Sequence, residues 1–184
     1  MLKPHVVERD VIRLCGRCAK IDKDNSMGEG IGSLFAQMDE IFSKVKNPVD
    51  DKFYGVSLNF CNSGKNSRMD YWLCKEVKNF WHKNEIGNWE ELEEGMETLT
   101  LPATRWLYIP VRYDDPFVKS LAPEDQRDDP GLLTPCVYEW ADQWMKENNY
   151  IQQDYPVELE IYGLHDGYED QGCCAEITLA KPIV

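Results

Sequence analysis

The sequence has few positive charges and no long apolar segment, and each absence excludes a class of function. Its 184 residues include 20 lysines and arginines against 33 aspartates and glutamates, for a formal net charge of -13. Nucleic-acid binding needs clustered cations that neutralise phosphates, so we expect no nucleic-acid partner. No run approaches the roughly 20 apolar residues that span a bilayer, and the N-terminus lacks the apolar core of a signal peptide. We therefore expect a cytoplasmic protein without a membrane partner.

Sequence motifs for nucleotides, metals and hydrolytic nucleophiles are also absent. There is no GxxxxGK[ST] loop, GxSxG elbow, HExxH pair or EF-hand loop, and the three histidines are scattered. Cys15 and Cys18 form a lone CxxC, which lacks the further ligands of a structural zinc site. A redox CxxC should open a helix after a strand, whereas Cys15 is expected to close a strand before a polar loop. We expect no metal and no cofactor.

Hydrophobic periodicity predicts two similar halves, each with the order strand–helix–strand–strand. The elements expected in the first half are a strand over 6–14, an amphipathic helix over 31–45, and a hairpin of strands over 53–60 and 69–77. Those expected in the second half are a strand over 100–111, a helix capped by Thr134 and Pro135, and strands over 155–162 and 172–184.

This pattern predicts an α+β fold in a single domain over 1–184. Duplicated units, about 5–80 and 97–184, would form a mostly antiparallel sheet with two principal helices and a ligand cleft between the halves. Nothing in the sequence indicates an oligomeric partner.

Aromatic side chains are abundant, with six Trp and nine Tyr, and some share strand faces with carboxylates. In the segment YPVELEIY (155–162), an aliphatic row alternates with a row made of Glu158, Glu160 and Tyr162. Trp106 and Tyr108 likewise share one face of their strand. We expect the aliphatic rows of both strands to pack under the helices. The opposite faces would then line the cleft, where Gly55 and its small neighbours leave room.

Such a cleft would suit flat apolar or cationic molecules. Aromatic rings hold them by area burial and cation–π attraction, and a buried carboxylate adds charge complementarity with a raised pKa. The glutamate face of an alternating strand also commonly faces water, and Trp140 lies on a helical stripe typical of a core. Tyr71 and Trp72 point to opposite faces of their strand, so at most one of them can meet the ligand. Periodicity alone leaves both interpretations open.

Several segments, taken in order, resemble the GyrI-like small-molecule-binding domain, which is also the effector-binding half of some AraC-type and MerR-type regulators. The most specific are EGMETLTLPATRW (94–106) and VYEWADQWMKENNY (137–150), the latter followed by a P…E.Y spacing. The resemblance covers roughly residues 5–184 and implies the same duplicated fold. It also implies that Glu160, two residues before Tyr162, lies in the pocket, with Glu158 as a secondary candidate. Because no helix-turn-helix precedes the domain, we expect a stand-alone module.

The resemblance implies two alternative functions. The preferred one is a binding protein that senses or sequesters toxic hydrophobic, aromatic or cationic compounds. Glu160 would supply the charge in that protein, and the candidate aromatic contacts are Trp106, Tyr108, Tyr162, Tyr71 or Trp72, and Trp140. The other is a hydrolase of cyclopropane-bearing electrophilic genotoxins, in which Glu160 would be the catalytic base. Inhibition of a protein partner such as a topoisomerase follows only from the family name and ranks lowest.

Overall fold

The computed structural model describes residues 2–22, 27–61, 68–83, 86, 89–90, 92–154, 157–163 and 176–184. The elements along the chain are β1 (His5–Arg9), β2 (Ile12–Ile21), α1 (Met27–Ala36), α2 (Met38–Ser43), β3 (Phe53–Cys61), β4 (Arg68–Glu76), β5 (His82–Lys83), β6 (Trp89–Glu90), β7 (Glu97–Leu101), β8 (Thr104–Arg112), α3 (Pro116–Ser120), the short 3-10 helix η2 (Glu124–Gln126), α4 (Pro130–Glu147), β9 (Val157–Tyr162) and β10 (Glu176–Ile183). No helix in these ranges is both long and apolar enough to cross a bilayer.

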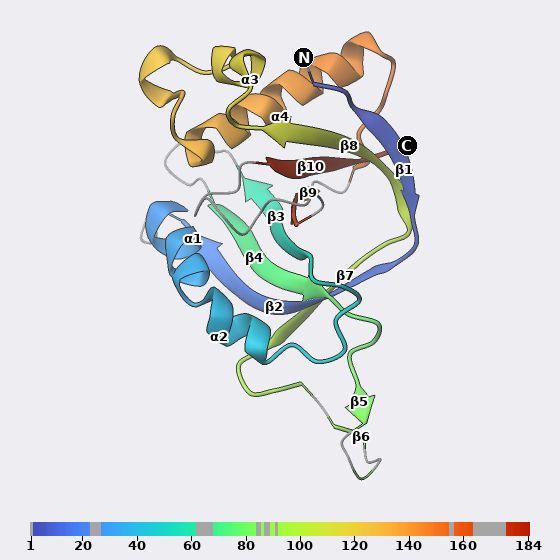
Figure 1. Cartoon of the computed structure of the whole chain (residues 1–184). Coiled ribbons are helices and arrows are strands. Elements are labelled where there is room, and N and C mark those ends of the chain that lie inside the picture. Colours follow the sequence, from blue (N-terminus) through green and yellow to red (C-terminus); the bar gives the residue numbers. More distant parts are fainter. Residues whose placement is uncertain are drawn as a thin grey trace.

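One antiparallel sheet of eight strands contains both halves of the chain, in the order β1-β8-β10-β9-β3-β4-β2-β7 (Figure 1). The central pair is β9 with β3, and the strands to either side follow in mirrored order. The outermost strands are exchanged, because β1 pairs with β8 of the second half and β7 pairs with β2 of the first. The predicted α+β fold with a mostly antiparallel sheet is confirmed.

The sheet has a buried core on both faces. On one face, which we call the helix face, side chains of the sheet pack with residues of the helices such as Ile41 and Val137. Figure 1 shows α1 and α2 beside the first-half strands, and α3 and α4 beside the second-half strands. On the other face, the back face, the core residues that the structure describes all belong to strands, among them the fully buried Leu159 and Trp106. Figure 1 shows that the outer strands of the sheet are strongly curved.

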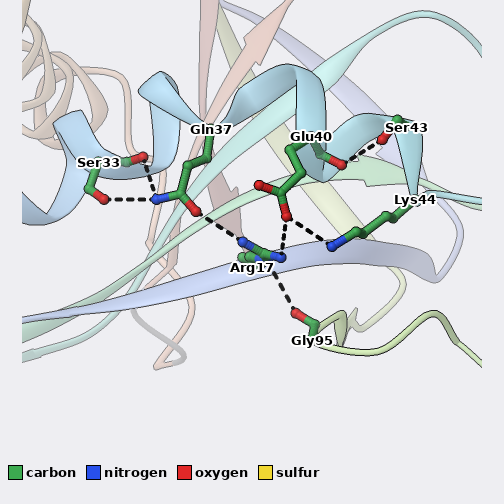
Figure 2. A network of polar contacts seen from close by, with 7 residues as sticks. All are labelled: Arg17, Ser33, Gln37, Glu40, Ser43, Lys44 and Gly95. Atoms are coloured by element: carbon green, nitrogen blue, oxygen red, sulfur yellow. Dashed lines mark hydrogen bonds and ion pairs between the residues drawn. The ribbon is translucent and has the colours of Figure 1, made fainter.

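The helix predicted over 31–45 is two helices that meet at Gln37. The Gln37 amide donates to the carbonyl and hydroxyl oxygens of Ser33, at 3.2 and 3.0 Å, and accepts from Arg17 at 3.0 Å. Figure 2 shows that Arg17 of β2 also donates to Glu40 at 3.0 Å and to the Gly95 carbonyl at 3.3 Å. One arginine therefore holds both helices and the segment before β7 against the sheet.

The second principal helix begins earlier than Thr134 and Pro135, so that prediction is wrong. Asp129 caps α4 by accepting from the Gly131 amide at 2.8 Å, and Pro130 is the first helical residue. The Asp–Pro pair carries the same start signal as Thr–Pro, about one turn upstream. Pro135 consequently lies inside the helix.

Candidate functional site

Glu160 lies near the middle of β9, at the junction of the two halves. Its Oε2 atom accepts from the Tyr71 hydroxyl at 2.8 Å and from the Tyr162 hydroxyl at 2.5 Å. All three residues lie on the helix face, and Glu160 itself is half-buried. The carboxylate is therefore fixed by two tyrosines. The predicted cleft between the halves would lie over this central pair of strands and stays a prediction.

Gly55 is the residue of β3 directly across from Glu160. A β-carbon at Gly55 would lie 2.2 Å from the Tyr71 hydroxyl and 2.8 Å from Oε2 of Glu160. These distances are far below van der Waals contact, so any side chain here would collide with the hydrogen bond. The bond between Tyr71 and Glu160 is thus possible because position 55 has no side chain.

Replacing Gly55 by alanine is expected to lower the free energy of unfolding by about 1–3 kcal/mol, the usual cost of overpacking. Tyr71 is buried and has little freedom to move its ring away. Tyr71→Phe removes the oxygen that the new methyl group meets first. The double variant should therefore lose less stability than the sum of the two single variants. Urea denaturation of all four proteins measures this coupling, and additive losses would contradict the proposed collision.

Burial dominates the electrostatics of this carboxylate. It raises the pKa of Glu160 above the ordinary value, and the hydrogen bonds from Tyr162 and Tyr71 offset only part of that effect. Burial, followed by the charge of Glu160, raises the pKa values of both tyrosines well above 10. The two phenols therefore remain protonated donors at neutral pH. Among the described residues, no lysine, arginine or histidine forms an ion pair with Glu160.

Glu158 faces the same side but is neutralised inside the protein. Its carboxylate lies 3.0 Å from the Nζ atom of Lys181, a lysine that is only 2% exposed and also pairs with Asp142. The same Nζ lies 5.4 Å from the centre of the Tyr138 ring. Burial raises the pKa of Glu158, whereas Lys181 lowers it. The two glutamates are thus electrostatically distinct, because Glu158 has a cationic partner and Glu160 has none within the described ranges.

Two phenylalanines, which the sequence interpretation did not single out, extend the aromatic surroundings of Glu160. The Tyr162 ring stacks on Phe53 with centroids 4.5 Å apart and an interplanar angle of 5°. Phe35 of α1 meets the same ring edge-on at 6.0 Å. Tyr138 of α4 donates to the carbonyl of Leu159 at 2.8 Å. Phe35 belongs to the apolar stripe of its helix, which was the available signal. Nothing in the sequence marks Phe53 as a neighbour of Tyr162, because their contact depends on the pairing of β3 with β9.

The aliphatic row of β9 does not pack under the helices, contrary to the expectation. Val157, Leu159 and Ile161 belong to the back-face core, while Glu158, Glu160 and Tyr162 face the helices. The expectation holds for β8, where Leu107, Ile109 and Val111 face the helices. The two strands differ because both faces of this sheet are buried, so an aliphatic row can lie on either one.

The structure therefore separates the predicted site residues into two groups. Tyr71 lies with Glu160, whereas Trp72, Trp106 and Tyr108 lie on the back face and cannot surround that carboxylate. Another predicted aromatic contact, Trp140, is half-buried on α4, edge-on to Phe117 at 6.0 Å and tilted against Trp144 at 6.5 Å. Tyr155 and Pro156 fall outside the described residues.

The cysteine pair has no shared site. β2 continues to Ile21, so Cys15 lies within the strand and does not close it as predicted. Cys15 packs in the helix-face core, and Cys18 points to the opposite face, because positions three apart alternate in a strand. Burial raises the pKa of each thiol to about 11. Within the part of the chain that the structure describes, no three His, Cys, Asp or Glu side chains are placed to hold a metal ion.

Two cavities lined by described residues lie away from Glu160. One is a narrow space beside Trp81 and Leu92, and the other lies on the back face beside Tyr54 and Tyr108.

Comparison with known proteins identifies the fold. The sequence matches no protein-family model and no curated protein. Among solved structures, the C-terminal domain of EcmrR is 14% identical with a TM-score of 0.60, over 100% of this chain and 98% of that one. SAV2435 bound to tetraphenylphosphonium is 10% identical with a TM-score of 0.56, over 99% and 94%. A putative transcription regulation protein of Staphylococcus aureus MU50 is 11% identical with a TM-score of 0.58, over 98% and 97%. The chain therefore shares the fold of the EcmrR C-terminal domain and of these two proteins along nearly its whole length.

Proposed function

We propose that this protein binds a lipophilic, aromatic cation at Glu160, in order to sense or sequester such compounds. The observation that carries the proposal is a half-buried carboxylate that has no cationic partner among the described residues and is held by two tyrosine hydroxyls. A buried charge without a counter-ion is unfavourable, and a ligand cation would neutralise it. Lys181 already provides this cation for Glu158, whereas Glu160 has no such partner in the described part of the chain.

Aromatic rings around the carboxylate support the same ligand class. Phe53, Tyr162 and Phe35 form a contiguous stacked and edge-on group next to Glu160. Aromatic faces attract cations and bury large apolar areas of a ligand. SAV2435, which shares the fold, has been solved with tetraphenylphosphonium, a cation of this kind. A hydrophobic cation thus matches both the charge and the side chains around it.

Tetraphenylphosphonium titrated into the protein, followed by calorimetry, tests the proposal. Glu160→Gln keeps the shape and an acceptor for the tyrosines but removes the charge, so the affinity should fall at least about tenfold. Glu139→Gln makes the same charge change at an exposed position of α4 and should have little effect. Neutral triphenylphosphine oxide should bind more weakly than the cation. Equal binding of the cation to wild type and Glu160→Gln would contradict the proposal.

The pH dependence has a defined sign. Because burial raises the pKa of Glu160, cation affinity should increase with pH, with a midpoint above the ordinary glutamate value of about 4.3. A raised carboxyl pKa adds stability below the unfolded-state pKa, and this stability is lost as pH rises through the folded-state pKa. Glu160→Gln should therefore not unfold the protein at neutral pH, which separates lost binding from lost structure.

Mass spectrometry of the same mixtures, with a cyclopropane-bearing electrophile as a further probe, detects turnover. Hydrolysis that Glu160→Gln abolishes would replace binding by catalysis as the function of this carboxylate. Binding without product supports the proposal as stated.

A further inference from the structure

The back face of the sheet holds a cavity of about 240 Å³ that the proposed function does not use. Its walls come from β1, β3, β4, β8 and β9, and from the segment before β3. Ile161, which follows Glu160 on β9, forms part of the apolar lining. The cavity and the Glu160 carboxylate therefore lie on opposite faces of the same strand.

A charged pair and two tyrosines form the polar wall. Arg9 donates from one nitrogen to both carboxylate oxygens of Glu76, at 2.9 and 2.7 Å, and the Tyr54 hydroxyl donates to the same carboxylate at 2.8 Å. The other terminal nitrogen of Arg9 donates to the Tyr108 hydroxyl oxygen at 3.1 Å. Glu76 thus receives three hydrogen bonds, and its capacity to accept from a ligand is largely used.

The unused hydrogen-bonding capacity of the wall consists mainly of donors. Since Tyr108 accepts from Arg9, its own proton is free to donate, and among the described residues it has no acceptor. Arg9 has five N–H groups, and its hydrogen bonds to Glu76 and Tyr108 do not use all of them. Lys52 adds a cation at the rim, paired with Asp50. Tyr108 is only 7% exposed, so its donor lies inside the cavity wall and not on the outer surface.

We propose that this cavity is a second binding site, for a small organic carboxylate. Its carboxylate would accept from Tyr108 and Arg9, and its apolar part would lie against Ile161 and Val49. At about 30 Å³ per water, the volume accommodates a single small ring with one carboxylate. This ligand class is opposite in charge to the cation proposed for Glu160, and the two sites lie on opposite faces of the sheet.

Benzoate, benzamide and benzylammonium provide matched probes, followed by shifts of backbone amide resonances in NMR titrations. Benzoate should give saturable shifts at Arg9, Tyr108 and Ile161, and the two other probes should bind there more weakly. Tyr108→Phe retains the ring and removes the donor, and should weaken benzoate about tenfold. Lys52→Gln alters only the rim, so the fold is not at risk, and should weaken benzoate by a smaller factor. Glu160→Gln should leave benzoate affinity within about twofold of wild type.

Three results would overturn the second site. These are benzamide or benzylammonium binding as tightly as benzoate, benzoate shifts that do not saturate, and benzoate affinity that neither Tyr108→Phe nor Lys52→Gln reduces. Failure of cation binding at Glu160 would not alter these outcomes, so the two proposals are tested separately.

Discussion

Replacing Gly16 by alanine is expected to lower the free energy of unfolding by about 3 kcal/mol, at the upper end of overpacking effects. A β-carbon at this position of β2 would lie 2.1 Å from the carbonyl oxygen of Leu73 and 2.6 Å from the Cα atom of Cys74. Both atoms are backbone of the neighbouring strand β4, where Gly16 pairs with Cys74. Removing these clashes would require β2 and β4 to move apart, which would weaken the hydrogen bonds between them.

Gly32 of α1 provides the matched control. Its β-carbon would meet nothing within 4 Å, and the residue is exposed. Alanine in a helix is favoured over glycine by about 0.5–1 kcal/mol, so Gly32→Ala should stabilise the protein. The same substitution is thus expected to change the free energy of unfolding in opposite directions at the two glycines, and urea denaturation measures both changes. A Gly16→Ala variant as stable as wild type would contradict the close strand approach.

Alternation along β9 correctly separated its residues into two rows but did not show which row faces the helices. The alternation of side chains along a strand shows which residues share a face of that strand. The relation between strands depends on register, and a shift of one residue would reverse it. Here Glu160 pairs with Gly55 on one side and Leu179 on the other, and Leu179 pairs with Ile109. This register brings Glu160 and the β8 aliphatic row to one face and leaves Trp106 and Tyr108 on the other.

Burial on both faces of the sheet explains the other predictions that were wrong. In a sheet with one wet face, the aliphatic row marks the buried side. In this protein a second core lies on the back face, and its described residues all come from strands, so aromatic and aliphatic residues are buried on either side. Trp106 is fully buried in that second core, although the sequence predicts it as an aromatic ligand contact. The α+β class and the placement of Glu160 on a strand were predictable, whereas several element boundaries and the composition of the surroundings of Glu160 were not.

Replacing Lys181 by methionine is expected to lower the free energy of unfolding at neutral pH by about 3 kcal/mol, the lower end of the cost of breaking a buried ion pair. The change leaves Glu158 without its cation in a site where 21% of its side chain is exposed. The side chain of Asp142 is 45% exposed, so the loss of its ion pair with Lys181 should contribute little to the destabilisation. Burial already raises the pKa of Glu158, and loss of Lys181 should raise it further. The destabilisation should therefore increase as pH rises above the ordinary glutamate range and should narrow in acid, where Glu158 is protonated in both proteins.

The double variant Lys181→Met with Glu158→Gln tests whether pairing accounts for this cost, because it removes both charges together. It should recover most of the stability lost by Lys181→Met alone, as replacement of a whole buried pair is far less costly than removal of one partner. Tetraphenylphosphonium binding then reports on the division of roles between the two glutamates. If Lys181 serves to neutralise Glu158, the folded double variant should retain cation affinity close to that of wild type, since Glu160 is unchanged. Loss of binding in the folded double variant would show instead that the Lys181–Glu158 pair positions the cation site, and would contradict the assignment of Glu160 as the carboxylate sufficient for binding.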